Sequence, residues 1–284
     1  SFFSGILNAN NKFAAAAAAP IILNIILICS LSISYFLELN FAKQLSYGVT
    51  LAGILQLFFL IFFTKHFYKP SLEIKLKLSN KVKFFFKKLL PSILSSGVTQ
   101  VNILVGTIIA SFEASAVSYL YYADRIYQIN LAIAGIAVGT VSLPVLSQAF
   151  KQKNISTISN IQSRSIELSL ILSIPASLGL ILASEEIINA LFGYGSFTIE
   201  NINMTSLALK YFGYGVPAFA LIKILSNFFF ARNNTKIPFY ISSFIVLLNI
   251  LISLSFFDKI GFIAIPIATS TSTWIGVLIY IVLL

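Results

Sequence analysis

Four polar side chains recur at helical spacing near the start of a long apolar stretch: Tyr121, Asp124, Arg125 and Gln128. Residues three and four positions apart lie above one another on a helix, so these side chains share one face. An arginine guanidinium binds phosphate through two parallel hydrogen bonds and remains charged when it is desolvated. A neighbouring carboxylate offsets part of that charge. An ionisable pair inside a membrane span predicts a functional site, and these residue types favour an anionic substrate.

A place at the membrane interface is the alternative for this cluster. Ile126–Phe150 is by itself long enough to cross a bilayer, which would leave Asp124 and Arg125 at the outer surface and Tyr121 in an aromatic belt. Two features favour the interior. The segment Ala114–Ala123 is apolar apart from its serines, so the pair lies well inside the helix. Only three of the 19 cationic residues are arginines, so an arginine at this position suggests that the planar guanidinium group itself is needed.

Three further polar side chains lie in apolar stretches. Lys223 is about 12 Å from the turn at Arg232, at 1.5 Å per residue, so it either snorkels to the interface or faces a cavity. Gln100 and Asn102 form a polar stripe, for which hydrogen bonding between helices is favoured over substrate contact.

The elements that position these residues must be membrane helices. The chain has 284 residues, of which 58% are apolar and 10% charged, and so few charges cannot cover soluble globules of this size. Runs that are apolar on every side exclude a membrane barrel, whose strands alternate. We therefore predict an all-α polytopic bundle with about eight spans: Ala17–Phe36, Tyr47–Thr64, Leu89–Phe112, Ser118–Phe150, Ile166–Ile188, Met204–Phe230, Phe239–Phe257 and Gly261–Leu284.

Catalytic and metal chemistry have few residues to use. The single Cys29 excludes a disulfide framework, the single His66 excludes a histidine metal cluster, and no Ser-His-Asp set is available outside the basic loop that holds His66. We expect no cofactor, no metal and no enzymatic activity.

The positions of the cations predict orientation. Fourteen of the 19 Lys and Arg fall on one side of the predicted spans, eight of them in Lys65–Lys88, so this side is expected to be cytoplasmic. The same segment resembles an electrostatic footprint for nucleic acid. A solvated loop resting on anionic lipid headgroups is the favoured interpretation, so nucleic acid is not an expected partner.

A short pattern occurs twice. Asn10–Lys12 precedes a helix containing Asn24, and Asn233–Lys236 precedes a helix containing Asn249. Six predicted crossings separate the two helices, so both copies have the same orientation, as in parallel six-helix halves. Glycines and prolines within the spans suit helices that bend. Together these features indicate a transporter.

The repeat predicts three parts. Residues 1–64 are the last two spans of an N-terminal lobe, 65–88 a basic cytoplasmic linker, and 89–284 a complete C-terminal six-helix lobe. Ser1 is not an initiator Met, and Ile281–Leu284 stops within an apolar run. We expect an internal fragment of a longer chain.

Several motifs resemble one family in order along the chain. They are Tyr121–Arg125 with Gly135–Thr140 and Leu143–Ser147, the loop Leu191–Thr198, the turn Leu7–Pro20, and the turn Phe230–Pro238. They are similar to the eighth helix, an outer loop and two turns of the MurJ (MviN) lipid II flippases, within the multidrug/oligosaccharidyl-lipid/polysaccharide exporter superfamily.

The resemblance implies a fourteen-helix protein with two lobes around a V-shaped cavity, of which this chain supplies helices five to twelve. It implies movement of lipid II, a lipid-linked peptidoglycan precursor, from the cytoplasmic to the periplasmic leaflet of the bacterial inner membrane. Asp124 and Arg125 fall on the family's cavity-lining acid and arginine. Arg125 with Lys223 is expected to bind pyrophosphate, and Asp124 to orient Arg125; Gln100, Gln128 and Tyr121 complete the candidate site.

Other functions remain open at this point. A related exporter of another polyprenyl-linked oligosaccharide or a drug/cation antiporter would share the architecture, although a drug antiporter would favour carboxylates over arginine. A membrane-embedded transferase lacks a catalytic cluster, and a purely structural bundle would need no Asp–Arg pair. The sequence leaves the coupling ion and the oligomeric state open.

Overall fold

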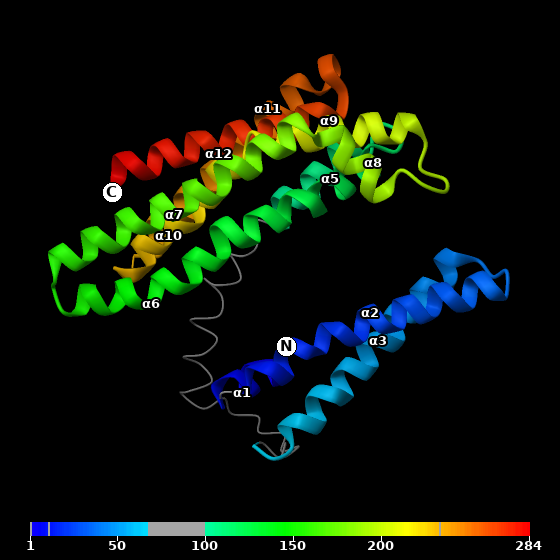
Figure 1. The fold of residues 1–284 in the computed structure, drawn as a ribbon, viewed down its shortest axis with the longest axis horizontal. Helices are drawn as coiled ribbons and strands as arrows, with labels where there is room; N and C mark the ends of the chain where they lie inside the picture. The colour runs from blue at the N-terminus through cyan, green and yellow to red at the C-terminus, as the bar shows by residue number, and fades with distance from the viewer. Residues whose placement is uncertain (1, 11, 68–99, 233) are drawn as a thin grey trace, which may run out of the picture. The chain divides into compact units, whose positions relative to one another are not determined.

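The computed structural model describes residues 2–10, 12–67, 100–232 and 234–284, all in helices and the turns between them (Figure 1). These residues form two compact units, 1–78 and 79–284. The division falls inside the predicted linker 65–88, most of which lies outside the described residues.

Unit 1 is a helical hairpin with a short helix beside it. α1 (Phe2–Ala9) packs against α2 (Phe13–Phe36) and α3 (Phe41–Thr64), and α2 packs along α3. The side chain of Asn40 caps α3 by accepting from the backbone N–H of Lys43 at 3.1 Å. Most apolar side chains of α2 and α3 are exposed, as suits helices whose solvent is lipid.

Unit 2 begins, within the described part, with helical residues 100–110. Then come α5 (Ala116–Leu131), a π-helical segment (Ala132–Ala137) and α6 (Val138–Lys151), which form one continuous 36-residue span. In the π-helical segment Gly135 lies against α10, where an added Cβ would be 3.1 Å from Cα of Ala220. The absence of a side chain therefore permits this close approach, as membrane helix packing often requires.

The fifth predicted span, Ile166–Ile188, has the wrong bounds. α7 runs from Ile155 to Leu182, so it begins eleven residues before Ile166. Asn154 caps this earlier start by accepting from the N–H of Thr157 at 3.1 Å. The chain leaves the helix at Ala183, and a separate short helix, α8 (Ser184–Phe192), begins with two glutamates in its first turn.

The sixth span is bent. α9 (Ile199–Gly213) and α10 (Val216–Ala231) meet at Tyr214 and Gly215 with a bend of 43°. Pro217 lies in the first turn of α10. Proline has no N–H to donate to the carbonyl four residues earlier, so it ends α9 and permits the bend.

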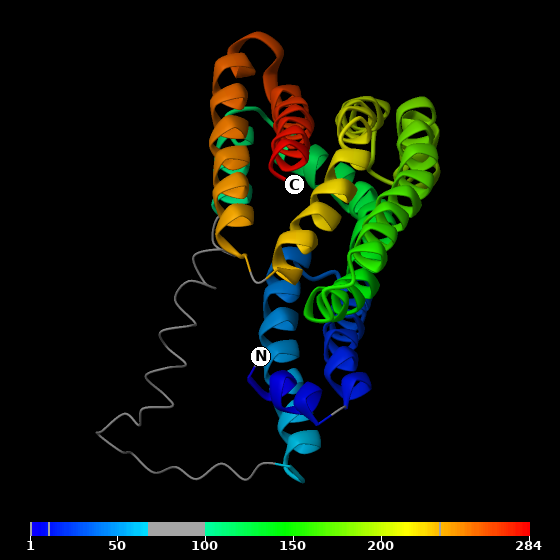
Figure 2. The same cartoon turned by 90° about the vertical axis from the view of Figure 1, so that its left-hand side faces the viewer.

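The last two helices form a hairpin. Figure 2 shows α11 (Lys236–Ile260) and α12 (Ala264–Leu283) side by side and joined at one end. A 3₁₀ turn, Gly261–Ile263, connects them. Gly261 has φ 62° and ψ −150°, a conformation open essentially to glycine alone.

Two apolar clusters hold unit 2 together. One, around Phe212 and Phe262, joins α5, α9, the 3₁₀ turn and the start of α12. The other, around Phe228 and Tyr280, joins α6, α10, α11 and α12. α10 packs against α7, α6 and α12, so it is the most enclosed of the described helices. Polar side chains are therefore unusual on the one face of α10 that these helices leave open.

The prediction of an all-α, polytopic membrane protein is confirmed. By length and composition, five helical stretches of the described residues can cross a membrane, or six when α9 and α10 count as one span. The last stretch, Lys236–Leu283, contains both helices of the α11–α12 hairpin, so it is longer than one crossing. Residues 89–99 of the third predicted span lie outside the described residues.

Candidate functional site

The predicted cluster on α5 forms two pairs of side chains one turn apart. Arg125 donates from Nη2 to the hydroxyl of Tyr121 at 2.9 Å, and its guanidinium carbon lies 4.6 Å from the centre of the Tyr121 ring. Gln128 donates from Nε2 to Oδ2 of Asp124. The adjacent acid and base therefore use different partners, and the contact that orients the guanidinium comes from Tyr121 rather than from Asp124.

The cluster lies on the surface of unit 2. Arg125 and Gln128 are exposed and Asp124 is half-buried, whereas Ala123 and Ile126 on the other side of α5 are buried in the core. Burial of one side of α5 fixes the rotation of the helix, so the polar face must point away from the core. The guanidinium keeps donors that can reach a ligand.

Aromatic contacts join the core side of α5 to α9 and to α10, the helix that carries Lys223. Tyr127 stacks on Phe212 of α9 at 5.1 Å and lies 5.1 Å from the ring of Phe219 on α10. Lys223 follows Phe219 by one helical turn and is exposed. Tyr127 packs against the core of unit 2, so these ring contacts join α5 to α10, the helix that carries Lys223.

The remaining predicted residues are less connected. Gln100 is exposed at the start of the described part of its helix, and no described hydrogen bond joins it to α5. The side-chain oxygen of Asn102 is buried without a hydrogen-bond partner among the described residues. Asn249 donates to the hydroxyl of Thr269 at 2.8 Å, while Asn24, its counterpart in the predicted repeat, is exposed.

Asn227 is a polar residue that sequence reasoning missed. Its Nδ2 donates to the carbonyl oxygen of Gly139 at 2.9 Å, and Gly139 lies two residues after the π-helical segment of the long span. The bond attaches α10 to α6 at the point where the helical geometry changes. Its signal in the sequence was one amide among phenylalanines, directly before Phe228.

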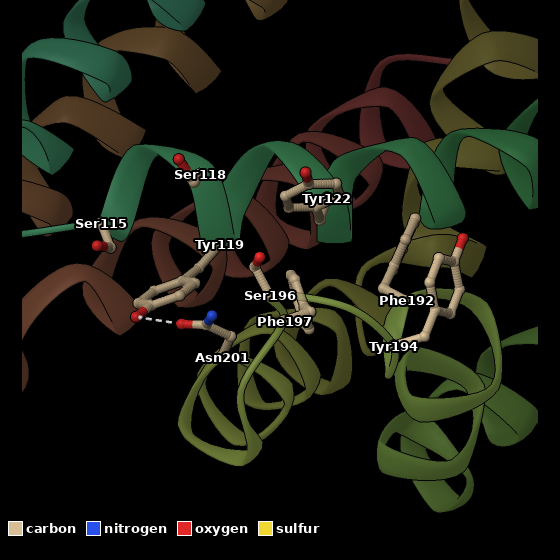
Figure 3. Close-up of a pocket in the computed structure, with 9 residues that line it drawn as sticks. All are labelled: Ser115, Ser118, Tyr119, Tyr122, Phe192, Tyr194, Ser196, Phe197 and Asn201. Carbon is tan, nitrogen blue, oxygen red and sulfur yellow. Dashed lines mark hydrogen bonds between the residues drawn. The ribbon is translucent and has the colours of Figure 1, made fainter. Parts of the chain in front are cut away.

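A second feature lies at the N-terminal end of α5, next to the polar cluster on that helix. A cavity of about 480 Å³ lies between the first turns of α5 and the segment that joins α8 to α9. Figure 3 shows the side chains that line it. The hydroxyl of Tyr119 donates to Oδ1 of Asn201 at 3.1 Å across it. Its lining consists of aromatic rings, hydroxyls and one amide: Ser115, Ser118, Tyr119, Tyr122, Phe192, Tyr194, Ser196, Phe197 and Asn201.

Comparison with known families decides the class of protein. A family model described as lipid II flippase MurJ matches residues 1–284, the whole of this chain. The chain belongs to the MurJ family. The resemblance to this family, read from motifs that include those on α5 and α6 and the loop Leu191–Thr198, is therefore confirmed.

Curated members of the MurJ family match nearly all of the chain. A probable lipid II flippase MurJ of Rhizobium tropici is 37% identical over 282 residues, covering 97% of this chain and 52% of the relative. One of Rickettsia prowazekii (strain Madrid E) is 36% identical over 278 residues, covering 96% and 54%. The chain thus spans about half the length of the curated relatives it matches.

Solved structures agree with this assignment to the MurJ family. A lipid II flippase MurJ in an inward closed conformation matches with a TM-score of 0.85 and 29% identity, covering 99% of this chain and 58% of that one. An inward-facing MATE family multidrug resistance transporter matches with a TM-score of 0.83 and 15% identity, covering 99% and 66%. The second match shows a shared fold and nothing about substrate.

Proposed function

We propose that the protein containing this chain moves lipid II from the cytoplasmic to the periplasmic leaflet of the bacterial inner membrane by alternating access. The observation that supports this most directly is an exposed arginine, oriented by Tyr121, on α5 of a chain that matches the MurJ family throughout its length. The named relatives are probable lipid II flippases. Transport of this kind breaks no covalent bond, which agrees with the expectation of no enzymatic activity.

The head group of lipid II presents a pyrophosphate, and Arg125 can bind it. Two parallel N–H groups of a guanidinium match two phosphate oxygens. The Tyr121 hydroxyl and ring hold the guanidinium in place before the ligand arrives, which reduces the conformational entropy lost on binding. In this proposal Gln128 holds the Asp124 carboxylate beside the site, and that charge weakens the anion's binding enough to permit release.

In this proposal Lys223, which is exposed on α10, supplies a second positive charge. It is a strongly hydrated point charge with no fixed geometry. In this proposal it attracts the phosphates at longer range while Arg125 fixes their orientation. No described hydrogen bond joins Gln100 to α5, so its role as a substrate contact stays a prediction.

The topology belongs to the same proposal. Residues 1–64 are the end of an N-terminal lobe and 89–284 a C-terminal lobe, with the basic segment 65–88 in the cytoplasm. The lysine-rich turns are cytoplasmic and the loop between α8 and α9 is periplasmic. Lipid II and membrane lipids are the proposed partners.

The test is charge reversal at Arg125 in the full-length protein. In cells depleted of their own flippase, Arg125→Glu is expected to reduce lipid II exposure at the outer leaflet by at least about tenfold, since a carboxylate repels the pyrophosphate. Arg125→Lys is expected to lose about threefold, because it keeps the charge without the bidentate geometry. Membrane insertion of each variant is measured by immunoblot.

Arg164 on α7 provides the control. It is also exposed, and its Nε donates to Asn160 at 3.1 Å on its own helix. Arg164→Glu is expected to leave transport within about twofold of wild type, because it is a surface charge away from the α5 face. Transport retained by Arg125→Glu removes Arg125 from the proposed site.

A further inference from the structure

The cavity at the outer end of α5 has a chemistry distinct from that of the Arg125 cluster. None of its nine lining residues is charged. Three serine hydroxyls, three tyrosines, two phenylalanines and one asparagine surround it (Figure 3). A neutral ligand with many hydroxyl groups and an apolar face suits such a lining, because each hydroxyl can be paired and each ring can cover C–H groups.

The walls of this cavity are fixed by contacts between distant parts of the chain. The ring of Tyr122 lies 4.8 Å from Phe192 and 5.4 Å from Phe197. On the other wall, the hydroxyl of Tyr119 donates to the side chain of Asn201 at 3.1 Å. These pairs join α5 to both ends of the segment between α8 and α9. A binding surface held in this way loses little entropy when a ligand arrives.

The cavity lies close to the proposed pyrophosphate contact. Tyr122 precedes Arg125 by three residues, which corresponds to about 4.5 Å along the helix and about 60° around it. Ser118 lies a further turn towards the outer end, about 10 Å from Arg125 along the axis. One saccharide ring attached to a phosphate at Arg125 can therefore reach the cavity.

We propose that this cavity is a saccharide subsite, which holds a neutral pyranose ring of the lipid-linked head group while its pyrophosphate is at Arg125. The proposal rests on the proposed function and adds the part of the substrate that Arg125 does not bind. The aromatic rings of Tyr122 and Tyr194 cover the faces of the sugar, and the serines and Asn201 bond its hydroxyls. A lipid acyl chain is a poorer occupant, because it would leave these polar groups unpaired.

The probe is chitobiose, a disaccharide of N-acetylglucosamine with neither phosphate nor lipid. Its binding to the full-length protein in detergent is measured by saturation-transfer NMR. Tyr194→Ala and Tyr122→Leu are each expected to weaken binding about threefold to tenfold, the scale of one lost aromatic contact. Tyr194 is 73% exposed, so its replacement leaves folding intact even if Tyr122→Leu destabilises the protein.

Tyr35→Ala is the matched control. Tyr35 is also 73% exposed and lies at the end of α2 that is predicted to be on the same side of the membrane. It lines no part of the cavity, so its removal is expected to leave chitobiose binding unchanged. Equal binding by wild type and Tyr194→Ala overturns the subsite, as does displacement of the probe by phospholipid that carries no sugar.

Arg125→Glu separates this proposal from the proposed function. It is expected to leave chitobiose binding unchanged while it abolishes lipid II movement, because the probe has no phosphate. If the cavity substitutions leave chitobiose affinity unchanged and Arg125→Glu still abolishes transport, the subsite proposal is rejected and the flippase proposal is retained. If chitobiose binds the cavity and Arg125→Glu still transports, the subsite stands and the pyrophosphate contact fails.

Discussion

Trp274 on α12 donates a hydrogen bond of 2.9 Å from its indole nitrogen to the carbonyl oxygen of Tyr214, the residue at which the α9–α10 span bends. It is one of three side chains that donate hydrogen bonds to backbone carbonyls at this bend. Ser270, also on α12, donates to the carbonyl of Tyr211 at 2.7 Å, and Ser177 on α7 donates to that of Gly213 at 2.7 Å.

These bonds explain how a bent helix is tolerated in the middle of unit 2. Pro217 has no N–H, so the Gly213 carbonyl four residues earlier lacks its helical donor. The hydroxyl of Ser177 supplies one. The N–H of Gly215 bonds to Phe212, which leaves the Tyr211 carbonyl to Ser270. A freed backbone carbonyl inside a membrane protein needs such a partner, so the bend is a built feature of the fold.

Removal of the Ser270 hydroxyl is predicted to destabilise the bend. Ser270→Ala loses a bond between helices and leaves the Tyr211 carbonyl unsatisfied, at an expected cost of about 0.6 to 1.7 kcal/mol. Ser272→Ala is the control, because Ser272 is equally buried and bonds only to Thr269 of its own helix at 3.2 Å. Thermal unfolding of the full-length protein in detergent measures both. Equal stability of the two variants would show that the bond to Tyr211 contributes nothing.

Glu113 is predicted to hold the start of the last helix. Its Oε2 accepts from the backbone N–H of Phe262 at 2.6 Å, across 149 residues of sequence. Glu113→Ala leaves the backbone N–H of the buried Phe262 without this acceptor, so about 1 to 2 kcal/mol of stability is expected to be lost. Glu113→Gln keeps an acceptor oxygen, so it should lose less than half as much. A larger loss for Gln than for Ala in thermal unfolding contradicts this role.

The helices themselves were largely predictable. Runs such as Leu57–Leu60 are apolar on every side, and a bilayer accepts only helices of that composition. The bounds of α7 were not, because a polar cap at Asn154 begins the helix well before its apolar part. Hydropathy reports where lipid lies, whereas capping reports where the backbone becomes helical. Gly213, Gly215 and Pro217 indicated a bend in the sequence, and a bend of 43° is present.

The candidate site was predictable only where it is local. Tyr121, Asp124, Arg125 and Gln128 lie within two turns, so helical periodicity alone places them together. The hydrogen-bond partners of Asp124 and Arg125 were not predictable, because their adjacency in the sequence suggested that Asp124 orients Arg125, whereas Arg125 bonds to Tyr121. The cavity at the end of α5 escaped prediction because it needs Tyr119 and Asn201, which are 82 residues apart and meet only through tertiary packing.

Tyr121 is predicted to position Arg125. Tyr121→Phe removes the hydroxyl that accepts from Arg125 and keeps the ring beneath the guanidinium, so lipid II affinity of the full-length protein is expected to fall about threefold. Tyr121→Leu removes both contacts, and about a tenfold fall is expected. Tyr121 is 56% exposed, so the melting temperature should change little. Tyr240→Leu on α11 is the control for loss of an exposed tyrosine.

The outcome that contradicts this role is specific. If Tyr121→Leu lowers affinity and stability together, the residue acts on the fold. If Tyr121→Leu binds lipid II as tightly as wild type while Arg125→Glu does not, the guanidinium needs no orienting partner.

Single cysteines can test the orientation of this chain, in which Cys29 is the only native cysteine. The background is a cysteine-free full-length protein that includes Cys29→Ser. Ser196→Cys lies in the loop between α8 and α9, and Gln152→Cys lies in the turn between α6 and α7; both positions are exposed. If lysine-rich turns are cytoplasmic, a membrane-impermeant maleimide should label Ser196→Cys in intact cells and label Gln152→Cys only after permeabilisation. Since these positions flank the span formed by α7, labelling of both from one side would also be inconsistent with α7 as a single crossing. The reverse pattern would invert the topology and place the cavity at the end of α5 on the cytoplasmic side, where it would meet the head group before transport rather than after it.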